Sequence, residues 1–445
     1  MRSIEIPARF TEFSVPRSNG TDTTVVVPTV MGSWALRYGR HGYYFMNCRT
    51  GKGLRVCVRH GEIIRPGLDR FKEAVARDEG SLSSLRWLRR SYHYGFNILE
   101  QVMLLTIPHT VTEAGDGRFI INLWAYYGYL LIDCARRSVT YFWTDESEDD
   151  HLLGSKQVFD PETGELTTLS FSLQDSLARI KDPLRPVESR LFRHRIGEAG
   201  SVTIWQGEMA DYLHDLVINE SRRYCAICEL GMYLDAAEEI IPSRVKIIDL
   251  EKGREWALDR FSVAAHAQFD PCDPDLIYFS SHNFQFRHSS ILGLLRKATY
   301  AVDFRGAASV HKVRLTPDGP REIGVFTQPD FHRLTNMHIF MHRGRKLMAA
   351  IGFPDTIFLV DPESMDAVGK IRVSDPGFFG RNGSRQEATV GTISPSPDGE
   401  MLFAQTTKSF QMIRIATGEP EYANRLFFNH TCANHMLASA DTDWC

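Results

Sequence analysis

The sequence predicts an all-β protein, a seven-bladed β-propeller with helical insertions that could form a lid over one end of its axis. Two observations predict this fold. Short hydrophobic strands recur along the chain, and many of them end in Asp or Asn followed by a turn that contains Gly or Ser. Four repeats also place a histidine nine or ten residues ahead of an apolar strand. Radial repetition of small sheets explains both regularities better than two β-sandwich domains do.

The turn signal is clearest where an aliphatic run ends in Asp133, Asp249 or Asp361. Looser copies follow Asn47, Asp160, Asp303 and Thr417. Asp, Asn and Gly suit such turns because they tolerate a positive φ or hydrogen-bond their own backbone. A second signal, Ser394 to Gly399 ahead of an apolar strand, resembles the turn-then-strand signature of YVTN- and TolB-like propeller blades.

These signals divide the chain into blades, and we expect one propeller domain over residues 1–445. The predicted blades lie near residues 28–60, 105–145, 157–206, 210–258, 264–326, 334–374 and 388–445. Apolar residues at helical spacing predict an insertion over 65–104 and smaller ones over 174–193 and 283–300. These insertions either cover the blade edges or form a lid that leaves room for an apolar substrate.

Composition sets the class of protein. Hydrophobic residues make up 43% of the 445 residues and charged residues 24%, which is typical of a globular chain with a large core. A net charge of −4 gives no basic stripe, so we expect no nucleic-acid partner. No apolar run is long enough for a signal peptide or a membrane segment. The eight cysteines form no disulfide framework, which predicts reduced thiols and a cytoplasmic protein.

The repeated histidines are the candidate functional residues. A single histidine beside a strand is usually a structural residue that bonds to a neighbouring backbone group. Equivalent histidines in several blades would instead face one another across the axis, and neutral imidazole is a common metal ligand. The sequence therefore predicts a metal site built from the repeats, whose histidines are His109, His214, His266 and His338.

One of these segments indicates a family. The run from Leu213 to Glu220 resembles the Met-His-Asp-Phe-x-Ile-Thr-Glu segment of the carotenoid cleavage dioxygenases, which include stilbene-cleaving members. The resemblance implies a four-histidine iron(II) centre on the axis, with dioxygen and an apolar or aromatic small molecule as substrates. The implied ligands are His214, His266, His338 and, close to the C-terminus, His435, for which His109 and His430 are rivals.

A second segment supports another chemistry. The run from His266 to Pro271, with residues 273–277 and the pair Ser281 and His282, resembles a segment of the oligogalacturonate lyases, which are propellers with a divalent metal held by histidines and a glutamine. That resemblance implies a lyase or isomerase with Mn²⁺ or another divalent cation, and Gln268 as a ligand. A third alternative is a non-enzymatic propeller that serves as an interaction scaffold.

Further residues are candidates for the surroundings of the metal. Ligand imidazoles need a partner for their second nitrogen, and Glu387 is the first candidate, followed by Asp215 and Glu113. A flat, conjugated substrate would need an aromatic pocket. The candidates for that pocket are the loop aromatics Phe284, Phe286, Phe378 and Phe379.

Overall fold

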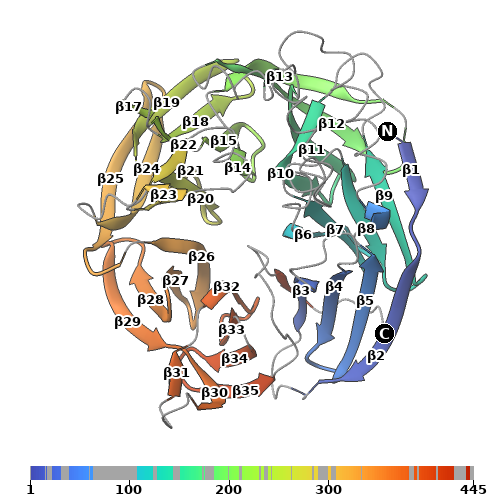
Figure 1. Cartoon of the computed structure of the whole chain (residues 1–445). Coiled ribbons are helices and arrows are strands. Elements are labelled where there is room, and N and C mark those ends of the chain that lie inside the picture. Colours follow the sequence, from blue (N-terminus) through green and yellow to red (C-terminus); the bar gives the residue numbers. More distant parts are fainter. Residues whose placement is uncertain are drawn as a thin grey trace.

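In the computed structural model, seven antiparallel sheets form a closed ring around a central axis (Figure 1). We number these sheets as blades 1 to 7 in chain order. The predicted all-β, seven-bladed architecture is therefore confirmed. The structure describes residues 2–15, 17, 23–31, 40–59, 61–63, 108–123, 128–143, 151–172, 175, 185–198, 200–209, 213–229, 232–234, 239–241, 243–261, 263–282, 285–288, 299–301, 307–331, 333–379, 385–387, 390–406, 409–424 and 437–440.

Blades 2 to 4 each run from an innermost first strand to an outermost fourth strand. Blade 2 contains β6 (Pro108–Glu113), β7 (Arg118–Leu123), β8 (Gly128–Asp133) and β9 (Ser138–Trp143). Blade 3 contains β10 (His151–Asp160), β11 (Glu165–Ser172), β12 (Val187–Arg195) and β13 (Val202–Met209). Blade 4 contains β14 (Leu213–Ile218), β15 (Tyr224–Glu229), β18 (Ser243–Asp249) and β19 (Arg254–Phe261).

Blades 5 to 7 follow the same order. Blade 5 contains β20 (Val263–Asp270), β21 (Asp273–His282), β24 (Ala308–Thr316) and β25 (Gly319–Gln328). Blade 6 contains β26 (Leu334–His342), β27 (Arg345–Gly352), β28 (Thr356–Asp361) and β29 (Asp366–Arg372). Blade 7 contains β32 (Val390–Pro395), β33 (Met401–Thr406), β34 (Phe410–Arg414) and β35 (Pro420–Asn424).

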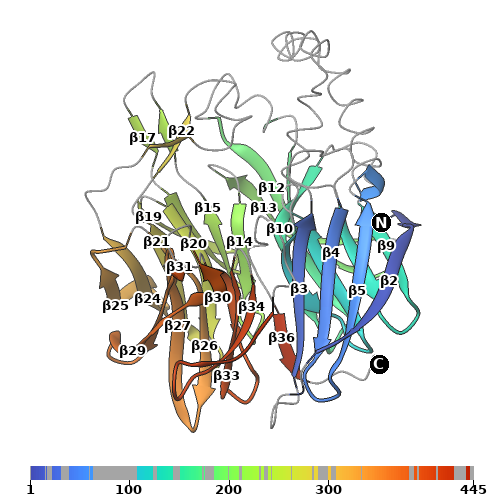
Figure 2. The ribbon, with the colours of Figure 1, turned by 60° about the horizontal axis from the view of Figure 1, so that its bottom comes forward.

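Blade 1 combines both ends of the chain. Its consecutive strands β3 (Thr23–Met31), β4 (Arg40–Asn47) and β5 (Lys52–Arg59) lie between β36 (Leu437–Ala440) inside and β2 (Ala8–Ser14) outside. Figure 2 shows β36, in red, beside β3, in blue. The preceding strand β1 (Arg2–Glu5) instead pairs with β9 at the outer edge of blade 2. Residues 2–14 thus connect the outer edges of two blades.

Burial of apolar side chains between neighbouring blades holds the ring together. Hydrophobic clusters span every blade-to-blade interface, including the one between blades 7 and 1. Middle strands are covered on both faces, so β15, with the sequence YCAICE, is buried at all its positions. Outer strands keep the alternation of a sheet with one solvated face, as in β25, where Ile323 and Val325 are exposed.

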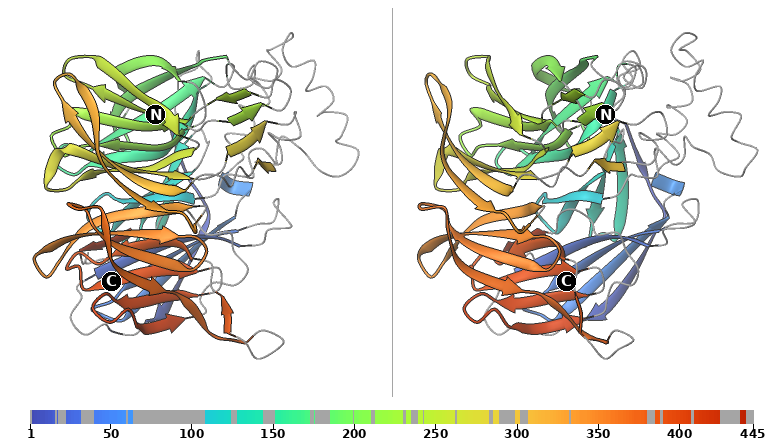
Figure 3. Two further views of the ribbon diagram at one scale, coloured as in Figure 1. Left: turned by 90° about the vertical axis from the view of Figure 1, so that its left-hand side faces the viewer. Right: turned by 60° about the vertical axis from the view of Figure 1, so that its left-hand side comes forward.

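The two ends of the ring differ in their connections. We call the end where β6, β14, β20, β26 and β32 begin the insertion face, and the opposite end the turn face. The insertion face bears an extra sheet of four strands, β17 (Glu239–Ile241), β16 (Met232–Leu234), β22 (Gln285–His288) and β23 (Thr299–Ala301), which stands clear of the ring (Figure 3). A hairpin of β30 (Ser374–Phe379) and β31 (Arg385–Glu387) connects blades 6 and 7.

The helical insertions were predicted incorrectly where the structure describes them. Residues 187–193 belong to strand β12, not to a helix, and buried Val187, Ser189 and Leu191 alternate with half-buried neighbours as a strand requires. Residues 285–288, which precede the predicted helical stretch 289–298, form strand β22. The segment 65–104 and the stretch 289–298 lie outside the described residues.

Tight turns close the hairpins of the turn face. The Asp249 carboxylate accepts hydrogen bonds from the backbone N–H groups of Glu251 and Lys252, and Gly253 has a φ of +63°. Asp361 caps its turn in the same way through Glu363 and Ser364. The predicted turn signal is confirmed at these positions, whereas Asp303 lies outside the described residues.

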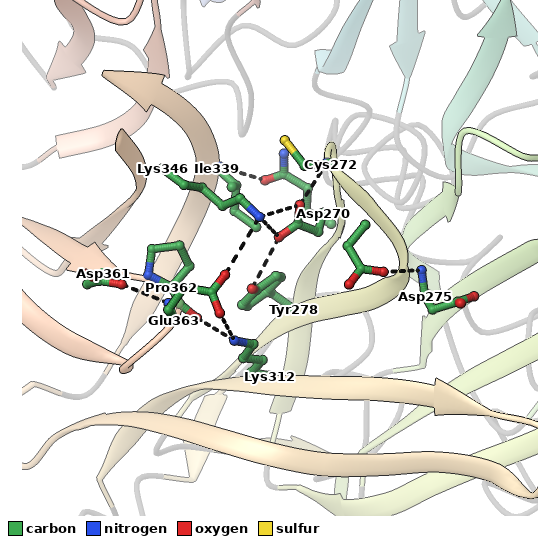
Figure 4. A network of polar contacts seen from close by, with 12 residues as sticks. Asp270, Cys272, Asp275, Tyr278, Lys312, Ile339, Lys346, Asp361, Pro362 and Glu363 are labelled. Atoms are coloured by element: carbon green, nitrogen blue, oxygen red, sulfur yellow. Dashed lines mark hydrogen bonds and ion pairs between the residues drawn. The ribbon is translucent and has the colours of Figure 1, made fainter. Parts of the chain in front are cut away.

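A buried ion pair joins blades 5 and 6 at the turn face. Both oxygens of the Asp270 carboxylate lie 3.0 Å from Lys346 Nζ, and the Asp270 side chain has no exposed surface. Figure 4 shows Asp270 between Lys346 and the hydroxyl of Tyr278, which lies 3.4 Å away. Burial acts to lower the pKa of Lys346, but the bond to Asp270 outweighs that effect and raises it.

Candidate metal site on the insertion face

The innermost strands share a backbone irregularity near the insertion face. Strands β6, β14, β20, β26 and β32 each carry one extra residue relative to the second strand of their blade, which makes a β-bulge. Bulges bend a strand and redirect side chains, and they are enriched beside functional sites. The bulges therefore mark where the ring departs from a regular sheet.

Histidines occupy three of these bulges. His109 lies at the bulge of β6, His214 at that of β14, and His266 with Ala267 at that of β20. The predicted equivalence of the repeated histidines is thus confirmed for blades 2, 4 and 5. Gly391 lies at the bulge of β32 in blade 7.

His338 does not share that position. In blade 6 the bulge contains Asn336 and Met337, and His338 follows it at the register position that Gln268 occupies in blade 5. Asn336 also shares the unusual backbone of His266, with φ values of +46° and +55° respectively. The sequence pattern matched His338 with His266 because both are histidines, whereas the backbone places Asn336 at the position equivalent to His266.

His266 is held in place by the neighbouring blade. Its side chain is buried, and Nε2 lies 2.5 Å from the Thr335 hydroxyl on β26. When Nε2 carries the proton and donates it to this oxygen, Nδ1 keeps the ring lone pair that can bind a cation. Metal-bound histidines usually donate their other ring N–H to an oxygen acceptor that fixes orientation and tautomer, and the Thr335 hydroxyl is an oxygen in that position.

A second imidazole lies beside it. The rings of His266 and His282 have centroids 5.9 Å apart and planes inclined by 52°. His282 ends β21, where it pairs with Val263 at the start of β20, and only 3% of its surface is exposed. The histidine repeat did not single out His282, because that signal followed the innermost strands alone, and only the resemblance to the oligogalacturonate lyases included this residue. Its place in the second strand next to a bulge follows from the register.

The remaining predicted metal ligands are less favourably placed or not described. His338 is half-buried on β26. The amide oxygen of Gln268 accepts the backbone N–H of Ile339 at 3.2 Å, so this oxygen joins blades 5 and 6, which disfavours its role as a ligand. His430 and His435 lie outside the described residues.

Apart from Glu113, the predicted positioning and pocket residues that the structure describes map to the insertion face. Asp215 follows the bulge of β14, and Glu387 pairs with Ser374 in the hairpin that also contains Phe378 and Phe379. Phe286 lies in β22 of the extra sheet, and Phe284 lies outside the described residues. Glu113 ends β6 at the turn face, away from the bulge.

The described residues fit part of a metal centre. Among them, no three His, Cys, Asp or Glu side chains are grouped so as to hold a metal ion. The His266 and His282 rings do form a buried pair, and the backbone of His214 lies at the equivalent bulge of the adjacent blade. The two neighbouring imidazoles are the candidate ligands that the described residues of this region offer.

Comparisons with known proteins add little to this picture. No protein-family model matches the sequence, and no curated protein does. Among solved structures, dihydro-heme d1 dehydrogenase NirN in complex with DHE aligns with a TM-score of 0.49 and 12% identity, over 97% of this chain and 78% of that one. This likeness is too low to transfer any property. Within the described part of the chain, we find no helix with the length and hydrophobicity of a membrane span.

Proposed function

We propose that the protein is a divalent-metal-dependent enzyme that acts on a small molecule at the insertion-face mouth of the propeller axis. The observation that carries this proposal is the buried pair of imidazoles, His266 and His282, beside a bulge that blade 4 repeats with His214. Neutral imidazole is the commonest protein ligand of divalent cations, and two rings this close can bind the same ion.

In this proposal His214, His266 and His282 are ligands, and His109, His338 and His435 are candidates for the remaining coordination positions. Iron(II) is the first candidate cation, with Mn²⁺ as the alternative. Histidine-only ligation of iron would supply open positions for dioxygen or substrate, and thus the chemistry of alkene cleavage. An oxygenase is therefore the preferred reaction class, ahead of a lyase or isomerase.

The chain's own residues would orient the ligands and enclose the substrate. Thr335 fixes the ring of His266 through its hydroxyl. Asp215 and Glu387 are the candidate carboxylates for the outer nitrogens of other ligands. Phe286, Phe378 and Phe379 belong to elements on the insertion face, where aromatic rings would exclude water and stack on an apolar or aromatic substrate.

Metal analysis of the anaerobically purified full-length protein tests the proposal. We expect about one iron per chain. His266→Gln and His282→Gln should each lower bound metal at least about tenfold, because each removes an imidazole nitrogen that the cation needs. His194→Gln is the matched control, since His194 is also buried but lies on β12 beside Tyr129.

The control should keep its metal. Burial, with a smaller contribution from the N-terminal amino group, lowers the pKa of His194 to about 4, so this ring is a neutral imidazole in a structural setting. Stoichiometric manganese with activity on uronates would favour the lyase. A folded protein that binds no divalent metal under these conditions would refute the proposal and leave the scaffold alternative.

A further inference from the structure

A serine, a histidine and a glutamate form a hydrogen-bonded row across blade 5. Ser281 Oγ lies 2.8 Å from His311 Nε2, and His311 Nδ1 lies 2.8 Å from Glu322 Oε2. The three side chains come from the neighbouring strands β21, β24 and β25. Ser281 and His282 are consecutive strand residues, so this row lies on the opposite face of β21 from the imidazole pair.

The geometry fixes the direction of the hydrogen bonds. An ionised glutamate can only accept, so Nδ1–H of His311 donates to Glu322. Nε2 then carries the ring lone pair and accepts the O–H of Ser281. This is the arrangement in which an imidazole acts as a general base toward a serine, and such triads are identified by geometry and not by chain order.

The surroundings of the row match that use. The Phe279 ring stacks on His311, with centroids 5.0 Å apart and planes inclined by 16°, which holds the imidazole in its plane. Ser309 lies directly opposite Ser281 in the register, and its hydroxyl is 3.1 Å from that of Thr327. Side-chain hydroxyls can stabilise an oxyanion, so Ser309 is the nearest candidate donor that the register offers.

Exposure limits the size of a substrate. Ser281 is 9% exposed, and the side chains of His311 and Glu322 are 12% and 28% exposed. Exposure therefore rises along the row, and the serine is its most buried member. Such a site admits a short acyl group better than a bulky one.

We propose that Ser281, His311 and Glu322 form an acyl-transfer site that hydrolyses small carboxylic esters, separate from the metal site. Ser281 Oγ bonds to the acyl carbon while its proton passes to His311 Nε2 and then to the departing alkoxide. Water next attacks the acyl-serine, gives its proton to the same nitrogen, and that proton returns to Ser281 Oγ. The net reaction consumes an ester and water and releases an acid and an alcohol.

Covalent labelling tests the site. The full-length protein, kept in a metal chelator, is treated with a short-chain fluorophosphonate, and the adduct is mapped by mass spectrometry. We expect one adduct, on Ser281, and a burst of p-nitrophenol from p-nitrophenyl acetate. The chelator separates this result from the proposed metal chemistry, because labelling requires no cation.

Variants assign the roles. Ser281→Ala should abolish the adduct, His311→Ala should slow labelling about 100-fold, and Glu322→Gln should slow it about tenfold. Ser280→Ala is the matched control and should label at the wild-type rate, because the Ser280 hydroxyl bonds to the backbone oxygen of Ala265 on the other side of the strand.

Two results would overturn the proposal. One is folded wild-type protein that carries no adduct on Ser281 after prolonged exposure, and this result needs no variant. The other is His311→Ala protein, folded by its thermal unfolding profile, that labels as fast as the wild type. In either case the three side chains would form a structural hydrogen-bond network that connects three strands.

Discussion

Residues with positive φ occur on both faces of the ring, but they belong to hairpin turns on one face and to strand bulges on the other. On the turn face, Gly253 and Gly399 adopt φ values of +63° and +69° and close short hairpins. On the insertion face, His266 and Asn336 adopt positive φ within innermost strands, where the backbone bulges and a polar side chain reaches the next blade. Non-glycine residues in this conformation carry a backbone cost.

The difference lies in the side chains and not in the backbone strain. Alongside the glycines, Asp116, Arg137, Arg222, Arg343 and Met365 also adopt positive φ in the hairpin turns of the turn face. Side chains with nitrogen and oxygen donors sit at the strained bulges, where their bonds to the neighbouring blade fix their orientation. Strain that persists around polar groups is a mark of functional sites.

The largest effect is expected on the turn face, from a substitution at the contact between blades 6 and 7. A Cβ added at Gly399 would lie 1.7 Å from the backbone oxygen of Met341 in blade 6. We expect Gly399→Ala to lower the free energy of unfolding by about 4 kcal/mol, because the two blades must separate. Urea denaturation measures the change. Gly253→Ala, whose Cβ would meet nothing within 4 Å, should cost about 1 kcal/mol. Equal losses in the two variants would refute the steric explanation.

A smaller effect is expected from the ion pair between blades 5 and 6. Asp270→Ala leaves the partly buried ammonium of Lys346 without its carboxylate, and we expect a loss of about 3 kcal/mol. Adding Lys346→Met should recover part of it in a double-mutant cycle. Because the folded-state pKa of Lys346 is raised, the pair's contribution should persist at neutral pH and fade only as pH rises through that pKa.

The exposed pair of Arg343 and Glu400 is the matched control for that cycle. Its atoms lie 3.0 Å apart, as in the Asp270 pair, but 60% of the Arg343 side chain is exposed. Solvent screens such a pair, so Glu400→Gln should change stability much less than Asp270→Ala. A comparable loss in both would show that burial does not distinguish the two ion pairs.

The smallest effect should come from the insertion face. The Asn336 side chain donates to the backbone oxygen of Gly391 at 2.8 Å. Asn336→Gly keeps the positive φ without strain and loses this bond, at a cost of about 1 kcal/mol. Asn336→Ala adds the backbone cost and should lose about 2 kcal/mol. Thermal unfolding compares them, and an Asn336→Gly variant less stable than Asn336→Ala would contradict the assigned strain.

The blade pattern could be predicted because its signals are local. Asp249 and Asp361 accept hydrogen bonds from backbone groups two and three residues away, so the sequence signal for each turn lies within a few residues of it. The histidine repeat located the bulges of blades 2, 4 and 5 for the same reason. It failed in blade 6 because His338 lies just past the bulge, where the spacing still resembles the repeat, whereas Asn336 is the residue that adopts the backbone of His266.

Contacts between distant segments could not be read from the sequence. His282 joins the candidate site through its pairing with Val263, and the row from Ser281 to Glu322 crosses three strands. Strand β12 looked helical because arginines interrupt its apolar residues, whereas burial between sheets decides its form. The prediction also assigned the C-terminal residues to blade 7, although β36 belongs to blade 1.

The composition of blade 1 has a consequence for how the protein is made. Its inner strand β36 is the last described strand to leave the ribosome, and its outer strand β2 is among the first. Blade 1 therefore stays incomplete until residues 437–440 have been synthesised, after the strands of blades 2 to 7. Pairing across so long a stretch of chain is slow. The nascent polypeptide must keep its unpaired strand edges from associating with other chains during that delay.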